Sequence, residues 1–275
     1  MRLCFLLLTA AAIAAAAAPA RAGTVTATYG GLDYSTGTNV NHDVGNPSPG
    51  GVNYAGSAGR FLWTVTSVSA SPGGLLGNYG TLPTTLYAFC VDLNQYAGST
   101  SFTETLAIDT LPQGGGATAM GSVAAGLLGR LYGTWYDYVK TAVPVTTGVT
   151  AGYTAGEVAA AFQLAVWEIV QDGYNALNLS SGRFQVNATV GGGSIQDKDK
   201  TLAKYFLDNL GSDSEVLLGL YSTAAQDQMI LVPLNEIIPV PLPGAAAAAL
   251  PIMMLIGGAL KSKRRHQREE ELANA

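Results

Sequence analysis

Runs of apolar residues in the first half of the chain, and again near its end, have the composition of β-strands. Six segments are rich in β-branched and aromatic residues and predict strands: 24–29, 61–68, 84–93, 101–108, 216–221 and 229–234. The rest of 23–60 is rich in Gly, Asn, Ser and Thr and predicts turns, and 69–82 predicts a loop. The pattern therefore predicts a β-rich protein with strands at both ends of its body.

Between these groups of strands the apolar residues recur at helical spacing. Three segments predict helices: 121–140, 155–171 and 197–210. Thr154 and Glu157 form a capping box at the start of the second helix. This helix is apolar almost all round, which predicts burial on several sides. The order favours an α+β fold, a β-rich sandwich or barrel with a helical insert over about 121–210.

The first 22 residues have the organisation of a secretory signal peptide. Arg2 precedes an apolar run over 3–18, and Ala20 and Ala22 form an A-x-A cleavage site for signal peptidase. The mature chain would then start at Gly23. The alternative is an uncleaved N-terminal membrane helix.

The other end predicts a transmembrane helix followed by positive charge. The apolar stretch 244–260 is near the lower limit of about 17 residues for a membrane span. Five basic residues follow it: Lys261, Lys263, Arg264, Arg265 and Arg268. The positive-inside bias places this cluster in the cytoplasm and the body outside. The alternative, a buried core helix, is disfavoured by the adjoining charges.

A short Pro-containing motif stands before this helix: Val240, Pro241, Leu242 and Pro243. Motif, helix and basic cluster over 240–268 together resemble the PEP-CTERM/VPLPA-CTERM sorting signals of Gram-negative bacteria. The sequence departs from that pattern in Gly244, where Ala is usual, and in the tail 266–275. The resemblance implies an exosortase-type transpeptidase as partner. It also implies an exported protein, anchored in the membrane at least transiently, with its body in the periplasm or at the cell surface.

The charge and the reactive residues of the body exclude several classes of protein. Residues 23–243 keep seven basic and sixteen acidic residues, a formal net charge of −9, which disfavours nucleic-acid binding. His42 is the single histidine before the tail, so no His-based metal site or catalytic triad is predicted. We expect no metal, no cofactor and no enzymatic turnover. A secreted hydrolase is disfavoured, since no acid–base set is visible.

Cys90 and Gln163 are the two body residues whose setting is unusual. Cys90 is the only cysteine left after signal cleavage, and it is either a buried inert thiol, an intermolecular disulfide partner or a functional group. Gln163 lies in the apolar helix, where its amide needs backbone or water partners or has a special role.

The strand segment Tyr87-Ala-Phe89-Cys90 and the helix segment Phe162-Gln-Leu-Ala-Val-Trp167 resemble the thioester domains of bacterial surface adhesins. The resemblance extends over the body, 23–235, and departs from the family in Val91, where a bulkier residue is common. It implies that Cys90 and Gln163 condense to an internal thioester. Trp167, Phe162 and Phe89 would shield the bond, and Asp92 is a candidate for shaping the site.

Together these features predict an exported envelope or surface protein. It would act once, as a covalent adhesin or tether to an amine or hydroxyl on a surface, a matrix polymer or a neighbouring protein. The alternative is a structural or extracellular-matrix protein of the same fold, in which Cys90 and Gln163 only pack together.

Overall fold

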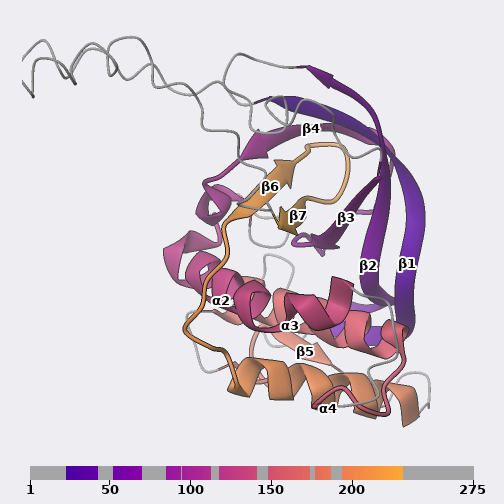
Figure 1. Ribbon diagram of the computed structural model, residues 1–275, viewed down its shortest axis with the longest axis vertical. Helices are drawn as coiled ribbons and strands as arrows, with labels where there is room; N and C mark the ends of the chain where they lie inside the picture. Colours follow the sequence, from indigo (N-terminus) through magenta and orange to yellow (C-terminus); the bar gives the residue numbers. More distant parts are fainter. Residues whose placement is uncertain are drawn as a thin grey trace, which may run out of the picture. The chain divides into compact units, whose positions relative to one another are not determined.

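Six antiparallel strands close into a β-barrel, and the helices lie together at one end of it (Figure 1). Around the barrel the strands follow the order β1 (Thr24–His42), β2 (Val52–Ser69), β3 (Thr85–Cys90), β7 (Gln228–Leu231), β6 (Leu217–Tyr221) and β4 (Thr100–Thr105). Pairing of β4 with β1 closes the ring. Of the two architectures that the sequence left open, sandwich and barrel, the structure therefore has the barrel.

The computed structural model describes the following residues: 23–42, 52–69, 85–93, 95–112, 118–140, 148–173, 177–186 and 194–231. The expected signal peptide, sorting motif, membrane helix and basic cluster all lie outside these ranges. None of the helices within them has the length and hydrophobicity needed to cross a membrane.

The first two strands form a hairpin much longer than the sequence pattern predicts. The turns expected within 23–60 are largely strand, because β1 and β2 pair along almost their whole lengths. Three register shifts interrupt the pairing, and Gly31 adopts a φ of +106° at one of them. A Cβ on Gly59 would lie 2.2 Å from the backbone oxygen of Tyr34. Glycine therefore permits the bulges and the close strand approach that let this hairpin bend around the barrel.

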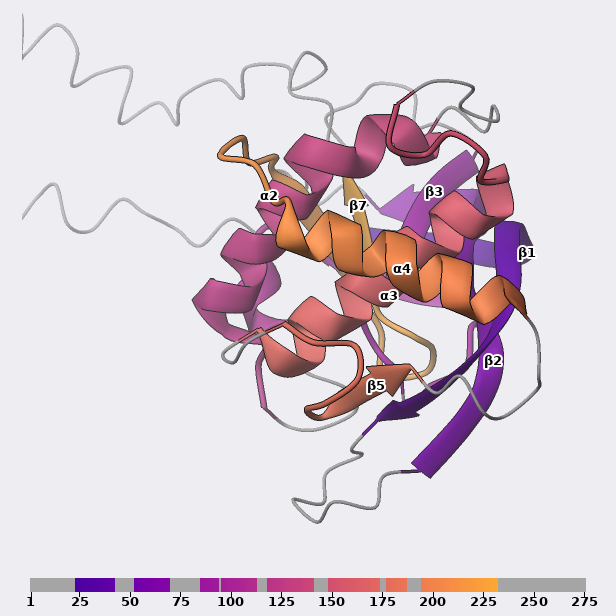
Figure 2. The same ribbon diagram turned by 90° about the horizontal axis from the view of Figure 1, so that it is seen from below.

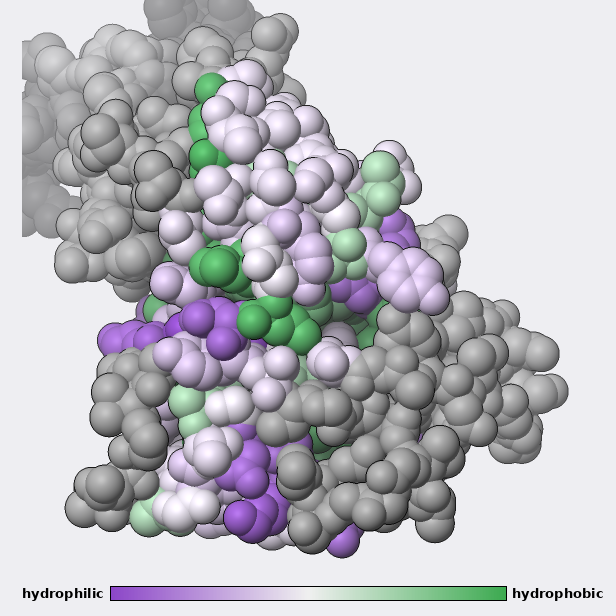
Figure 3. Space-filling model, turned by 90° about the vertical axis from the view of Figure 1, so that its right-hand side faces the viewer, coloured by the Kyte–Doolittle hydropathy of each residue, from purple (hydrophilic) through white to green (hydrophobic). Residues whose placement is uncertain are grey.

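The barrel interior is filled by side chains that alternate along the strands. Phe61 and Trp63 of β2 are buried, whereas Thr64 and Thr66 are exposed. The ring of Trp63 packs edge-on against Phe102 of β4, with centroids 5.1 Å apart. Figure 3 shows the face over β1 and β2, where weakly polar residues predominate among the described atoms. The hairpin thus has one apolar face toward the core and one polar face toward solvent.

Helix α3 (Ala155–Asp172) is the central helix of the fold. It contacts the barrel strands β1, β2 and β3 as well as the helices α2 (Gly121–Lys140) and α4 (Ser194–Asp208) (Figure 2). All its residues from Glu157 to Asp172 are buried, as its apolar surface predicts, and the predicted capping box is confirmed. Two short elements were not predicted, the 3₁₀ turn η2 (Ile108–Thr110) and β5 (Phe184–Val186), which pairs with the far end of β1.

Arg60 of β2 joins the barrel to the end of helix α2. Its guanidinium donates hydrogen bonds to the backbone oxygens of Val139 and Lys140, at 3.2 and 3.0 Å, and forms an ion pair with Asp33. These oxygens belong to the last turn of the helix, where carbonyls lack partners within the helix and the helix dipole is negative. The guanidinium also lies 4.3 Å from the ring centroid of Tyr87. The buried charge is therefore balanced by an ion pair, two helix carbonyls and an aromatic ring, although Nε of Arg60 has no hydrogen-bond partner among the described residues.

We predict that Arg60→Met lowers the free energy of unfolding by about 2–4 kcal/mol, because it leaves the helix carbonyls and Asp33 without their charged partner. Urea unfolding followed by circular dichroism measures the loss. Lys204→Met is the control, since Lys204 forms an exposed ion pair with Asp208 and its loss is expected to cost no more than about 0.5 kcal/mol. Equal losses in the two variants would contradict the role of Arg60.

Candidate functional site

Cys90 is the last residue of β3, at the point where the sheet opens. The ladder between β3 and β2 ends at the pair Ala88 and Phe61. The next residue, Val91, donates its backbone N–H to the backbone oxygen of Asp227 on the β7 side, at 3.0 Å. Because successive residues of a strand direct their polar groups to opposite neighbours, the N–H and C=O of Cys90 face the β2 side, beyond the end of that ladder.

The side-chain amide of Gln163 fills this position as a neighbouring strand would. The backbone N–H of Cys90 donates to Oε1 of Gln163 at 2.9 Å, and Nε2 of Gln163 donates to the backbone oxygen of Cys90 at 2.8 Å. Both residues are 0% exposed. The two bonds bring together residues that are 73 positions apart in the chain. The partner that a buried amide requires is therefore Cys90 itself.

Aromatic packing holds the strand and the helix at this separation. Phe89 adjoins Cys90 and Phe162 adjoins Gln163, and the centroids of their rings lie 4.7 Å apart. Tyr132 of α2 packs edge-on against both rings. Phe89 and Phe162 are completely buried. These two residues, which were expected to shield the thioester, thus also pack β3 against α3 beside the Cys90–Gln163 pair.

The Cys90 thiol is free and enclosed. Its Sγ donates to the backbone oxygen of Asp92 at 2.7 Å. Burial raises the pKa of this thiol well above its usual value, and the negative charge of Asp92 raises it further, whereas the bond to the Asp92 backbone and the nearby Trp167 indole lower it. The thiol is therefore protonated at neutral pH, and its enclosure disfavours the intermolecular disulfide that the sequence left open.

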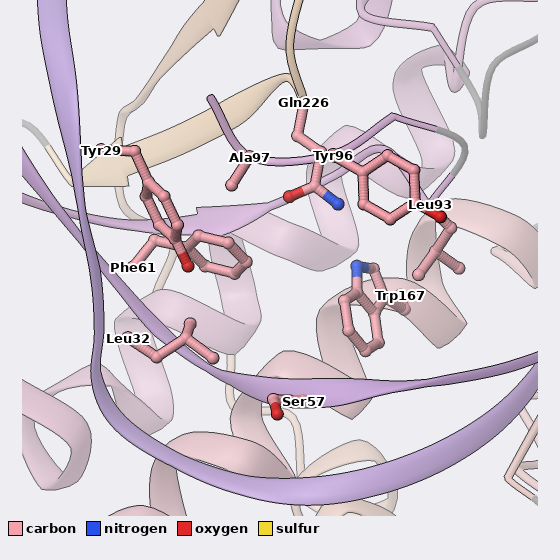
Figure 4. Close-up of a pocket in the computed structure, with 9 residues that line it drawn as sticks. All are labelled: Tyr29, Leu32, Ser57, Phe61, Leu93, Tyr96, Ala97, Trp167 and Gln226. Atoms are coloured by element: carbon pink, nitrogen blue, oxygen red, sulfur yellow. The ribbon is translucent and has the colours of Figure 1, made fainter. Parts of the chain in front are cut away.

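Trp167 lies one helical turn beyond Gln163 and separates the pair from a pocket. The pocket has a volume of about 270 Å³, and Trp167, only 4% exposed, forms part of its wall (Figure 4). The residues that line it are Tyr29, Leu32, Ser57, Phe61, Leu93, Tyr96, Ala97, Trp167 and Gln226. None of these nine carries a charge. Trp167 thus lies between the Cys90 thiol and this pocket, a position that fits the shielding role expected of it.

Two buried carboxyl groups near this region have raised pKa values. Burial raises the pKa of Asp227 to about 7, and the charge of Asp92 contributes to the shift. Asp227 also acts electrostatically on the Cys90 thiol. Burial raises the pKa of Glu168, one residue after Trp167, to about 8. Each carboxylate keeps one backbone donor: the N–H of Ser222 for Asp227 and the N–H of Asn178 for Glu168.

Sequence reasoning missed two features of this site. The group that polarises the Gln163 carbonyl is a backbone N–H, that of Cys90, and every non-proline residue has such a donor. The second feature is Asp227, to which the sequence assigned no role in the site. Its position beside the site depends on the pairing of β3 with β7, which leaves no local pattern in the chain. Asp92, the expected shaping residue, contacts the thiol through its backbone oxygen.

Comparison with protein-family models, curated proteins and solved structures finds no match for this chain. Within the described ranges, no group of three or more His, Cys, Asp or Glu side chains could hold a metal ion. The site is therefore defined by its own geometry: a buried thiol, a clamped amide and an adjoining neutral pocket.

We predict that the free energy of unfolding falls as the pH rises from about 4 to 8. Because the pKa of Glu168 is about 8 and that of Asp227 about 7 in the folded chain, the folded state holds more protons than the unfolded state in this window. One pKa unit corresponds to about 1.4 kcal/mol, so a loss of about 2 kcal/mol or more is expected.

Urea unfolding at a series of pH values measures this slope. Glu168→Gln, which removes the titrating group, should flatten the upper part of the curve, and Asp227→Asn should flatten the part below pH 7. A free energy of unfolding that rises toward pH 8 would contradict the assignment.

Proposed function

We propose that this protein is an exported surface protein that acts once, as a covalent tether, through a thioester between Cys90 and Gln163. The observation that carries the proposal is the reciprocal hydrogen bonding that clamps the Gln163 amide against Cys90, both residues being fully buried. A nucleophile and an acyl donor from distant parts of the chain are thereby held side by side, which removes most of the entropic cost of their reaction.

The reaction uses only groups of the site. Sγ of Cys90 attacks the amide carbon of Gln163, a C–S bond forms, the C–N bond breaks, and the thiol proton leaves with the nitrogen as ammonia. The N–H of Cys90, 2.9 Å from Oε1, is placed to stabilise the negative charge that develops on this oxygen. Because burial keeps the thiol protonated, attack and proton transfer must be coupled.

The surroundings fit an acyl group that has to survive until a target arrives. Phe89, Phe162 and Trp167 surround the pair with apolar surface and exclude water. A target amine or hydroxyl attacks the thioester carbon, forms an amide or ester with Gln163 and returns the proton to the sulfur. The thioester is consumed in this step, so the protein is a tether and no enzyme with turnover.

Export and sorting are part of the same proposal and rest on the sequence. Signal peptidase would remove residues 1–22, and an exosortase-type transpeptidase would process the region 240–268. The helix 244–260 would hold the protein in the membrane of a Gram-negative cell at least transiently. The body would then reach the periplasm or the cell surface, where a covalent adhesin meets its target or the extracellular matrix.

The alternative is a structural or matrix-associated protein of the same fold. The two hydrogen bonds between Gln163 and Cys90 also favour this alternative. They satisfy both polar atoms of the Gln163 amide without any covalent bond. In this case Gln163 would serve as a ladder partner that completes the open end of β3, and Cys90 would pack as a small apolar residue.

The mass of the full chain distinguishes the two functions. We predict that the wild-type chain is lighter by one ammonia than its sequence requires, and that methylamine restores this mass as an adduct on the peptide that contains Gln163. Cys90→Ala and Gln163→Ala should each show the full mass and bind no methylamine. Gln171→Ala is the matched control, because Gln171 is a second buried glutamine of the same helix and its loss should leave the deficit in place.

A full wild-type mass together with a titratable Cys90 thiol in the unfolded chain would reject the thioester and leave the structural function. A deficit that persists in Cys90→Ala would place the reaction at another residue.

A further inference from the structure

The pocket beside Trp167 has polar groups that the fold itself does not use. Oε1 of Gln226 is buried and has no hydrogen-bond partner among the described residues, and the buried Nε1 of Trp167 has only the Cys90 thiol, a weak acceptor, beside it. Gln226 is only 7% exposed, and its backbone is fixed by a 3.2 Å hydrogen bond from its N–H to the oxygen of Tyr96. A buried donor or acceptor without a partner is costly, so this pair points to a ligand.

The two groups belong to side chains that line the same pocket. In Figure 4 the indole nitrogen of Trp167 points toward the Gln226 amide, which projects between Tyr29 on one side and Tyr96 on the other. One group is a donor only and the other is an acceptor. A ligand that satisfies both must itself donate and accept, which a hydroxyl group does and an ammonium group does not.

The rest of the lining fits an uncharged ring. Aromatic side chains of Tyr29, Phe61 and Tyr96 supply apolar surface, and no lining residue has a charge that would balance a cation or an anion. Tyr96 is 76% exposed and marks the rim. The volume of about 270 Å³ is enough for one small ring.

We propose that this pocket is a capture site for a hydroxyl-bearing ring of the kind found in saccharides, recognised by Trp167 and Gln226. The hydroxyl oxygen would accept a hydrogen bond from the indole N–H of Trp167. The hydroxyl proton would be donated to Oε1 of Gln226. The capture step does not need a thioester.

The consequence for covalent attachment rests on the function proposed above. Trp167 stands four residues after Gln163 on helix α3, lines the pocket and has its indole beside the Cys90 thiol, so a hydroxyl bound at Trp167 would be next to the acyl group. Its oxygen attacks the carbon of the thioester, a C–O bond forms, the C–S bond breaks, and the hydroxyl proton passes to the sulfur of Cys90. The product is an ester between the ring and Gln163, with a free thiol.

Binding is tested in the full-length Cys90→Ala chain, which keeps the pocket and cannot react. Isothermal titration calorimetry compares cyclohexanol and methyl glucoside, which carry hydroxyls, with cyclohexylamine, which has the same ring but carries a cation. We expect the hydroxyl compounds to bind and cyclohexylamine to bind at least about tenfold more weakly.

Two substitutions in that chain test the recognising groups. Gln226→Met removes the acceptor and Trp167→Phe removes the donor while keeping an aromatic ring, and each should weaken binding of cyclohexanol about tenfold. Ser57→Ala is the matched control, because Ser57 also lines the pocket but lies away from the Gln226 amide in Figure 4. Preferential binding of cyclohexylamine, or no binding of either hydroxyl compound, would overturn the proposal. This comparison of ligands uses the Cys90→Ala chain with an unchanged pocket, so it does not depend on whether the pocket variants fold.

Covalent capture is tested separately in the wild-type chain. Methyl glucoside should add to the Gln163 peptide through a linkage that hydroxylamine cleaves, as an ester requires. If the wild-type chain lacks the ammonia deficit, the thioester is rejected. The calorimetric titration of Cys90→Ala still decides whether the pocket binds a hydroxyl-bearing ring. A chain that has the deficit and reacts with cyclohexylamine but never with methyl glucoside would overturn the hydroxyl assignment alone.

Discussion

The contact between the Gln163 amide and the backbone of Cys90 is the constraint on which the site depends. It forms where the ladder between β2 and β3 ends, and it replaces the missing strand partner by a side chain from helix α3. The helix must therefore lie at one position and in one rotation relative to the barrel. The packing of Phe89 against Phe162, each adjacent to one member of the pair, holds the same geometry by apolar contact.

This constraint also accounts for the electrostatics around it. A helix pressed against the open end of a barrel excludes water from both, so the groups enclosed there titrate in a medium of low polarity. The Cys90 thiol and the Asp227 carboxyl both have raised pKa values, with burial as the largest cause. Under the proposed function, the same enclosure would protect an activated acyl group, and the neutral pocket next to Trp167 would be the opening for a target.

The parts of the fold that depend on neighbouring residues were predictable. Helix 155–171 was recognised from its capping box and its continuous apolar surface, and it spans Ala155–Asp172 with Thr154 as its cap. The long β1–β2 hairpin was not, because its Gly-, Asn- and Ser-rich stretch has turn composition and becomes strand through pairing with a partner. The three residues of β5 are too few to give a periodic pattern and depend on their contact with β1.

The sequence by itself determined which residue types could react, a single body cysteine and a glutamine in an apolar helix, and the local structure that carries each. It also determined the net negative charge and the apolar and basic segments at the two ends. Only the tertiary structure decided that Cys90 lies at the open end of a ladder, that its own N–H polarises Gln163, and that Trp167 and Gln226 face one pocket. Helix caps and periodicity arise within a few residues, whereas these contacts join segments brought together by barrel closure.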